Sequence, residues 1–211
     1  ILRCLVGSEM CIRDRLHVDA IKHSGGTNAI TINSSGVVHI AGSIIQVVNA
    51  DKLDTGSANV TLPTWADSGL TCTITPKFNT SKILVHVNAA MGINSNVFNY
   101  MRVVRNVGGG SFSMLSEATT AGSRNAVHAT VYDSDNQGPV ELVNFVHLDS
   151  PATTSAVIYK VQLAQSGGSQ TVGLGFSNRD NDGAAYDPRV SSRIVLQLSL
   201  IHISEPTRHR R

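Results

Sequence analysis

Helix-forming stretches, aromatic residues and paired cysteines are all scarce in this chain of 211 residues. Aromatic residues account for 5% of it, and outside the terminal segments the only glutamates are Glu117 and Glu141. Surface helices draw mainly on Glu, Lys, Ala and Leu, so this composition argues against a helical fold. No run of about 18 apolar residues occurs, and we therefore expect no helix inserted in a membrane.

The two ends of the chain resemble translated sequencing adapter. Residues 4–15 read Cys-Leu-Val-Gly-Ser-Glu-Met-Cys-Ile-Arg-Asp-Arg, and residues 198–209 read Leu-Ser-Leu-Ile-His-Ile-Ser-Glu-Pro-Thr-Arg-His. If a transposase-type library adapter encodes the second segment, its opposite strand encodes Leu5 through Asp14 in a shifted frame. Two unrelated natural termini would almost never be reverse complements over this length, and such segments are set aside before fold reasoning. We expect residues 1–15 and 198–211 to be adapter-derived and their removal to change neither fold nor stability appreciably, except that Leu198 could stand in for the last residue of a native strand.

Setting these ends aside changes the charge and the cysteine count. Of 17 basic and 15 acidic side chains, the ends hold six and three, which leaves 11 and 12 in residues 16–197. A nearly neutral segment offers no general electrostatic attraction to nucleic acid or to an anionic membrane. Cys72 becomes the single cysteine, so we expect neither a disulfide framework nor a cysteine-ligated metal.

Alternating apolar residues predict a chain made of β-strands. In residues 82–91, Ile83, Val85 and Val87 fall on one face and His86 on the other, which is the period of a half-buried strand. Clusters rich in Asn, Asp, Gly and Ser separate such segments. Further strands are expected at residues 44–49, 57–62, 70–75, 97–107, 111–116, 126–132, 140–148, 156–163, 171–177 and 192–198. Short strands at this spacing predict an all-β fold, an antiparallel β-sandwich or jelly-roll-like domain.

Residues 16–43 differ from the rest of the chain. Two short strands are expected there, at residues 28–33 and 37–40, and a pair this small buries little apolar surface by itself. We interpret residues 16–43 as a shaft or linker β segment and place the sandwich domain at residues 44–197.

Sequence patterns of catalytic or cofactor sites are absent. The serine elbow, the His-Glu-x-x-His metal motif and the glycine motifs that bind phosphates or dinucleotides do not occur. His147 stands two residues before Asp149, a pair that could orient an imidazole, but a structural role at a strand end is favoured. We predict that the protein is no enzyme and holds no cofactor.

Two polar turns could be taken for ligand sites. Residues Asp180–Gly183 resemble the start of a calcium loop, but the acidic residue that closes such a loop is missing. Because Asp, Asn and Gly also dominate tight turns, a turn without metal is favoured. Residues Gly108–Gly110 lack the lysine and the helix of a phosphate cradle, so a hairpin tip is favoured there.

Four aromatic residues could supply a sugar-binding platform: Phe98, Tyr100, Tyr132 and Tyr186. In a chain this poor in aromatics we favour positions in the core instead, although Tyr132 and Tyr186 border polar loops.

Three stretches of the chain carry distinctive motifs. Gly69–Val87 contains Gly-Leu-Thr-Cys-Thr-Ile-Thr-Pro and then Asn-Thr-Ser-Lys-Ile-Leu-Val, Leu148–Gln162 opens with Leu-Asp-Ser-Pro, and Ser191–Leu198 closes with an alternating apolar strand. Together they resemble the C-terminal domains of tail-fibre-like proteins from environmental, often marine, bacteriophages. Upstream, Ile21–Ile40 is similar to a linker of such fibres. The match departs around Trp65, in a stretch usually rich in Ser and Thr.

The resemblance implies a virion adhesin or fibre tip that works as a homotrimer and joins other tail proteins through a missing N-terminal part. It implies attachment to a host-surface glycan or protein, without turnover, and it names no binding residues. Recognition varies most in polar loops on a rigid scaffold, so the loops Asp133–Gly138 and Asn178–Asp187 are the expected contact regions. The candidate contact residues are Tyr132, Asp133, Asp135, Asn136, Asp180, Asp182 and Tyr186.

Two other functions stay open. A fibre-borne glycan depolymerase would need a pair of acids at a suitable separation, and the available glutamates and turn aspartates fall in dissimilar contexts. A purely structural virion decoration protein would need no binding site. Turnover of capsular polysaccharide would favour the first alternative, and glycan binding by the domain would argue against the second.

Overall fold

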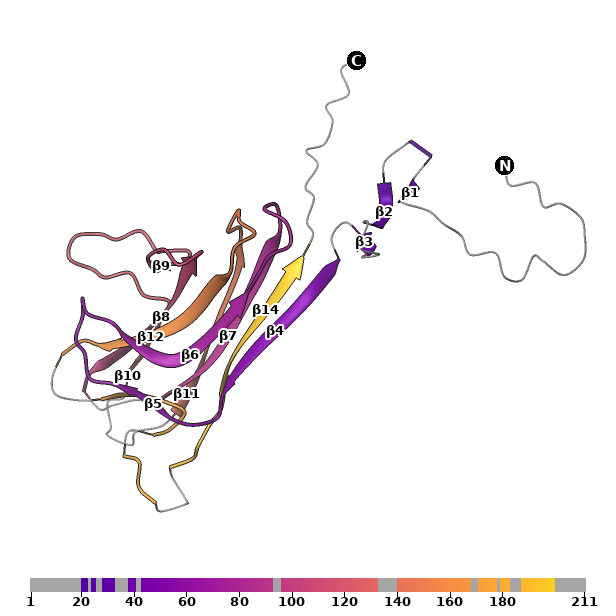
Figure 1. The fold of residues 1–211 in the computed structure, drawn as a ribbon. Helices are drawn as coiled ribbons and strands as arrows, with labels where there is room; N and C mark the ends of the chain where they lie inside the picture. Colours follow the sequence, from indigo (N-terminus) through magenta and orange to yellow (C-terminus); the bar gives the residue numbers. More distant parts are fainter. Residues whose placement is uncertain are drawn as a thin grey trace, which may run out of the picture. The chain divides into compact units, whose positions relative to one another are not determined.

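A computed structural model describes residues 20–22, 24–25, 28–32, 38–40, 43–92, 96–132, 140–167, 171–177, 179–182 and 187–199. The chain forms two compact units, which we call unit 1 (Ile1–Ser43) and unit 2 (Ile44–Arg211) (Figure 1). The described residues contain no helix, as the composition predicts, and hence no helix of the length and apolarity that crossing a membrane requires.

Unit 1 is a small antiparallel sheet of three strands, in the order β1-β2-β3. The strands are β1 (Ala20–Lys22), β2 (Asn28–Ile32) and β3 (Val38–Ile40). The sequence predicts β2 and β3 but misses β1, because three residues are too few to show an alternating pattern.

One face of the unit 1 sheet carries five aliphatic side chains. Ile21 pairs with Ile30, and Ile30 pairs with Ile40, so the three lie in one row across the strands. Ile32 and Val38 pair with each other two residues further along, and a shift of two keeps them on the same face. Ile21, Val38 and Ile40 are 46–50% exposed. We call these five residues the aliphatic face of unit 1.

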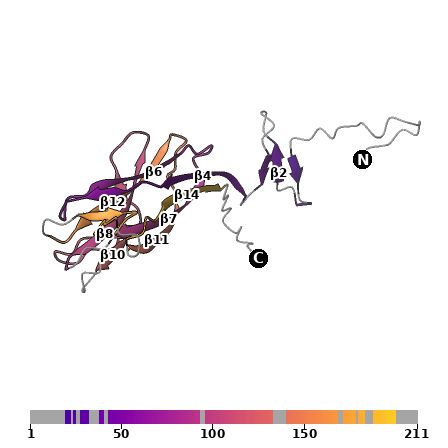
Figure 2. The same ribbon diagram turned by 90° about the horizontal axis from the view of Figure 1, so that it is seen from below.

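Unit 2 contains two antiparallel sheets (Figures 1 and 2). The five-stranded sheet has the order β10-β8-β12-β6, with β9 paired to β8: β10 (Ala129–Tyr132), β8 (Phe98–Val107), β12 (Val157–Gln165), β6 (Ala66–Ile74) and β9 (Ser113–Met114). The six-stranded sheet has the order β4-β14-β7-β13-β5, with β11 paired to β7: β4 (Ile44–Lys52), β14 (Ser192–Ser199), β7 (Lys82–Gly92), β13 (Val172–Leu174), β5 (Gly56–Ala58) and β11 (Val140–Asp149).

The core of unit 2 lies between the two sheets, and the expected register of β7 is confirmed. Ile83, Val85 and Val87 are fully buried, whereas His86 between them is exposed. On the other sheet, Val157 and Tyr159 are equally buried and belong to the same hydrophobic cluster. The prediction of an antiparallel β-sandwich or jelly-roll-like domain is therefore confirmed.

The end of β14 corrects one expectation from the sequence. Leu198 is fully buried in the core cluster and pairs with Ile83 of β7 and Gln46 of β4. Ser199 continues both ladders (Figure 1, where β14 is yellow). The buried Leu198 thus ends the strand that the sequence predicts at residues 192–198, whereas the expectation that the adapter-derived end stays outside the fold is wrong for Ser199. Residues 1–15 and 200–211 lie outside the described residues.

Strand β6 begins four residues earlier than expected, because a bulge in its ladder to β12 interrupts the alternating pattern from which the start is predicted. Lys160 pairs with Thr71 and Gln162 with Asp67, so extra residues of β6 lie opposite Val161. Gly69 in this bulge has φ +82°, a left-handed conformation that favours glycine. The Ser68 hydroxyl donates to the Val161 carbonyl (2.8 Å) and so ties the bulge to β12.

Candidate functional site

Three aromatic rings gather on the outer side of the five-stranded sheet. Phe98 and Tyr132 pair across β8 and β10, with ring centroids 4.6 Å apart and 30° between their planes. Tyr100, two residues along β8, lies nearly parallel to Phe98 at 6.4 Å. Phe98 is 46% exposed and Tyr132 is 44% exposed.

The expectation that these aromatics lie in the core is wrong. The residues that alternate with them, Asn99, Met101 and Val131, are the ones that face inward and are buried. Composition cannot reveal whether the odd-numbered or the even-numbered residues of β8 face the core, because this strand carries large residues on both sides. Tyr186 lies outside the described residues.

A ladder of polar side chains crosses the same outer face. The Arg102 guanidinium donates from Nε to Gln162 Oε1 (2.8 Å) and lies over the Trp65 ring, 4.4 Å from its centroid. Gln162 in turn donates from Nε2 to Asp67 Oδ1 (2.7 Å). The ladder therefore runs over β8, β12 and β6 in one row, because the backbone register sets these residues side by side.

Beyond this ladder the face is hollowed. Lys160 Nζ contacts Asp67 Oδ2 (2.5 Å) and lies 3.8 Å from the centroid of the Phe112 ring, which is 40% exposed. With Gly69, Thr71 and neighbouring residues these side chains line a hollow of about 270 Å³. The bulge in β6 brings both Asp67 and Thr71 to its rim.

We call this surface the aromatic face. Its members are Trp65, Asp67, Phe98, Tyr100, Arg102, Phe112, Tyr132, Lys160 and Gln162. Half of the ten aromatic residues of the chain belong to it.

The charges on the aromatic face are compensated. Partial burial would raise the pKa of Asp67, but hydrogen bonds from Lys160 and Gln162 outweigh it and lower the pKa. Burial lowers the pKa of Arg102, while electrostatic attraction by Glu117 and Asp67 acts to raise it. The two cations of the face therefore stand beside two carboxylates.

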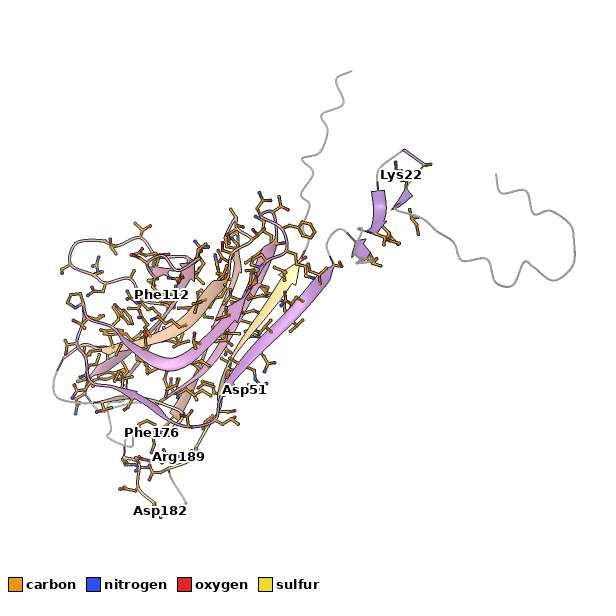
Figure 3. All side chains as sticks on the ribbon, viewed as in Figure 1. Lys22, Asp51, Phe112, Phe176, Asp182 and Arg189 are labelled. Carbon is orange, nitrogen blue, oxygen red and sulfur yellow. The ribbon has the colours of Figure 1, made fainter. Side chains whose placement is uncertain are left out.

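The described residues of the second expected contact loop, between β13 and β14, form two ion pairs. Asp180 contacts Arg189 (Oδ1 to Nη2, 2.6 Å), and Asp187 contacts Arg179 (Oδ1 to Nε, 3.2 Å). Arg189 also lies over the Phe176 ring, 5.5 Å from its centroid. Phe176, Asp182 and Arg189 lie together in Figure 3, well apart from Phe112. Asp180 and Asp187 therefore stabilise the fold through ion pairs. Asp182, another predicted contact residue, is exposed.

Several predicted contact residues cannot be placed. Asp133, Asp135 and Asn136 lie outside the described residues, as Tyr186 does. Tyr132, at the start of that loop, is the predicted contact residue that the structure brings into the aromatic face. In the described part of the chain, no three His, Cys, Asp or Glu side chains gather in an arrangement suited to a metal ion.

Asp149 does not orient His147 but belongs to a buried structural network. The Tyr159 hydroxyl donates to Asp149 Oδ2 (2.6 Å), and Arg105 contacts Oδ1 (2.5 Å). Burial and the bond to Asp149 raise the pKa of Tyr159. Because a buried carboxylate needs such partners, this cluster fixes one end of the sandwich.

Comparison with known proteins yields a likeness of fold. No family model and no curated protein matches the chain. The structure is similar to that of infectious bursal disease virus strain Gx, with 12% identity and a TM-score of 0.35 over 87% of this chain and 47% of that one. It is also similar to the VP2 subviral particle of that virus, with 12% identity and a TM-score of 0.36 over 82% of this chain and 46% of that one. For strain Gt the identity is 11% and the TM-score is 0.37, over 86% of this chain and 47% of that one. The chain thus spans about half the length of the proteins it resembles.

Proposed function

We propose that this chain is a virion fibre-tip module that attaches to a host cell surface without chemical turnover. The observation that carries the proposal is the aromatic face, on which Phe98 and Tyr132 are nearly half exposed on a rigid sheet. Aromatic rings with polar rims are favoured at recognition surfaces, since they bury much area at little entropic cost. The resemblance to bacteriophage tail fibres supports placing this module on a virion.

The aliphatic face of unit 1 supports the homotrimer. A single sheet buries its apolar face only against another element, and Ile21, Val38 and Ile40 of this face are about half exposed. Copies of the same chain offer a surface that is equally apolar and carries no opposing charge, and closed symmetry satisfies every copy alike. Three copies would present three aromatic faces, so that weak contacts combine at high effective concentration.

The distribution of acids supports binding rather than hydrolysis. Glu141 belongs to β11 of the six-stranded sheet, whereas Glu117 follows β9 beside the aromatic face. Asp67 is engaged by Lys160 and Gln162. A glycosidase needs two carboxyl groups that face one bond. Glu141 is on the other sheet, and Asp67, which like Glu117 attracts Arg102, is already engaged by two side chains.

Adsorption of the fluorescently labelled full chain to a panel of bacterial cells tests the proposal. We expect adsorption to at least one strain, a large loss in the double variant Phe98→Ala/Tyr132→Ala, and no loss in Leu142→Ala, which truncates an equally exposed residue on β11. Release of reducing sugar from the adsorbing cells would favour the depolymerase. Absence of adsorption to every strain, or equal adsorption of all variants, would favour the decoration protein.

A further inference from the structure

The aromatic face is longer than a site for one small ligand. Lys160 pairs with Val104, six residues along β8 from Phe98, and each residue of a strand advances about 3.3 Å. The stack of Phe98 and Tyr132 therefore lies about 20 Å from the hollow beside Lys160 and Phe112. Between the two, Tyr100 and the Arg102–Gln162–Asp67 ladder continue the surface.

The surface alternates apolar rings with groups that donate or accept hydrogen bonds. Sugar rings have the same two characters, since one side presents C–H groups and the rim presents hydroxyls. Exposed rings would bind the C–H side, while the exposed Asp67 carboxylate and the tyrosine hydroxyls would bind the rim.

Because the cations of the aromatic face already have partners, the face favours an uncharged glycan over an anionic one. Lys160 contacts Asp67 at 2.5 Å, and Arg102 is held by Gln162 over the Trp65 ring. An anionic glycan would have to displace Asp67 from Lys160 to find a free cation. An uncharged chain needs no such exchange.

We infer that the aromatic face binds an uncharged glycan chain, laid along β8 and β12 from Tyr132 to Phe112. This inference rests on the proposed function and names its ligand class. The hollow beside Phe112 takes one end of the glycan chain, and the Phe98–Tyr132 stack takes the other.

Titration calorimetry of the full chain against uncharged oligosaccharides tests this. The probes are gluco-, galacto- and manno-oligosaccharides of increasing length, with oligo-alginate as the acidic comparison. We expect affinity to rise with length for at least one uncharged series, and to change less than about twofold between low and high salt. Tyr132→Ala should lower that affinity about tenfold or more, and Leu142→Ala should leave it unchanged.

Phe112→Ala adds a test of the orientation along the face. This substitution should lower the affinity for long oligosaccharides and leave the affinity for the shortest one that still binds unchanged. The melting temperature of the variant verifies that it is folded. Equal effects on all lengths, preference for oligo-alginate, or no binding of any uncharged series would overturn the inference. If adsorption to cells persists while these fail, the inference falls and the attachment function stands. If adsorption also fails, the function falls with it.

Discussion

The two units of the chain differ in how they bury apolar surface. Unit 2 closes two sheets over a core in which residues such as Val85 and Leu196 are fully buried. The described residues of unit 1 form a single sheet, and Ile21, Val38 and Ile40 of its aliphatic face are about half exposed. A β-sandwich covers both of its apolar sheet faces within one chain, whereas a lone three-stranded sheet needs another surface to cover its apolar face.

The largest expected effect is on the core of unit 2. Val85→Asp puts a charge where no water reaches and should cost on the order of 5 kcal/mol or more, which is comparable to the whole stability of a small domain. His86→Asp, on the exposed side of the same strand, should change stability by less than about 1 kcal/mol. Thermal melting followed by circular dichroism compares the two. Similar melting temperatures would show that β7 has a different register.

The next effect concerns the end of β14. A chain that stops after Ser199 should melt like the full chain. A chain that stops after Gln197 loses the buried Leu198, which should cost about 2–5 kcal/mol. Chemical denaturation of both truncated chains measures the difference. Equal stabilities would mean that Leu198 contributes no packing.

Unit 1 should respond differently to a comparable change. Ile30→Asn places an amide at the centre of the aliphatic face and should abolish association while leaving the melting temperature of unit 2 unchanged. Lys22→Asn, an exposed change in β1, is the matched control and should keep the association. Sedimentation velocity at micromolar concentration reads out the mass. A variant Ile30→Asn that still associates would place the contact between copies elsewhere.

The smallest effect is a pH dependence from His128. Its Nδ1 accepts from the Val103 amide (2.8 Å) and its Nε2 lies 2.6 Å from the Leu115 carbonyl, so the neutral ring is the one that fits. Burial lowers the pKa of His128, and the nearby His147 and Arg102 lower it further. The hydrogen bond to the Leu115 carbonyl acts in the opposite direction but does not outweigh them.

The unfolded chain therefore takes up a proton below about pH 6.5, while the folded His128 stays neutral until lower pH. Stability should be constant above that pH and fall as the pH drops below it. Melting temperatures between pH 5 and pH 8, about the range of histidine titration, measure this. His128→Gln should flatten the dependence, and the exposed control His86→Gln should not. A dependence that survives in His128→Gln would assign it to another group.

Much of the fold could be predicted from the sequence, because alternation in long strands is strong. The spans of β7, β8, β11 and β12 were predicted within two residues at each end. The three-residue β1 and the bulge at Gly69 were missed, since neither gives a periodic signal.

The candidate site was predicted less well. The sequence predicts Tyr132 as a contact residue but favours core positions for its neighbours Phe98 and Tyr100, which is wrong. Trp65 was noticed as a departure from a motif, and its position over Arg102 depends on a pairing that no local pattern shows. Sites built across strands require the register of the whole sheet, and that register is decided by tertiary packing.

We expect unit 2 to fold by itself and unit 1 to fold only when copies associate. Hydrogen exchange of the full chain at a series of protein concentrations tests it directly. The amides of β7 should be protected at every concentration, and those of β2 should become protected only as the mass rises to that of the trimer. Protection of β2 in a chain that sediments as a monomer would contradict the account.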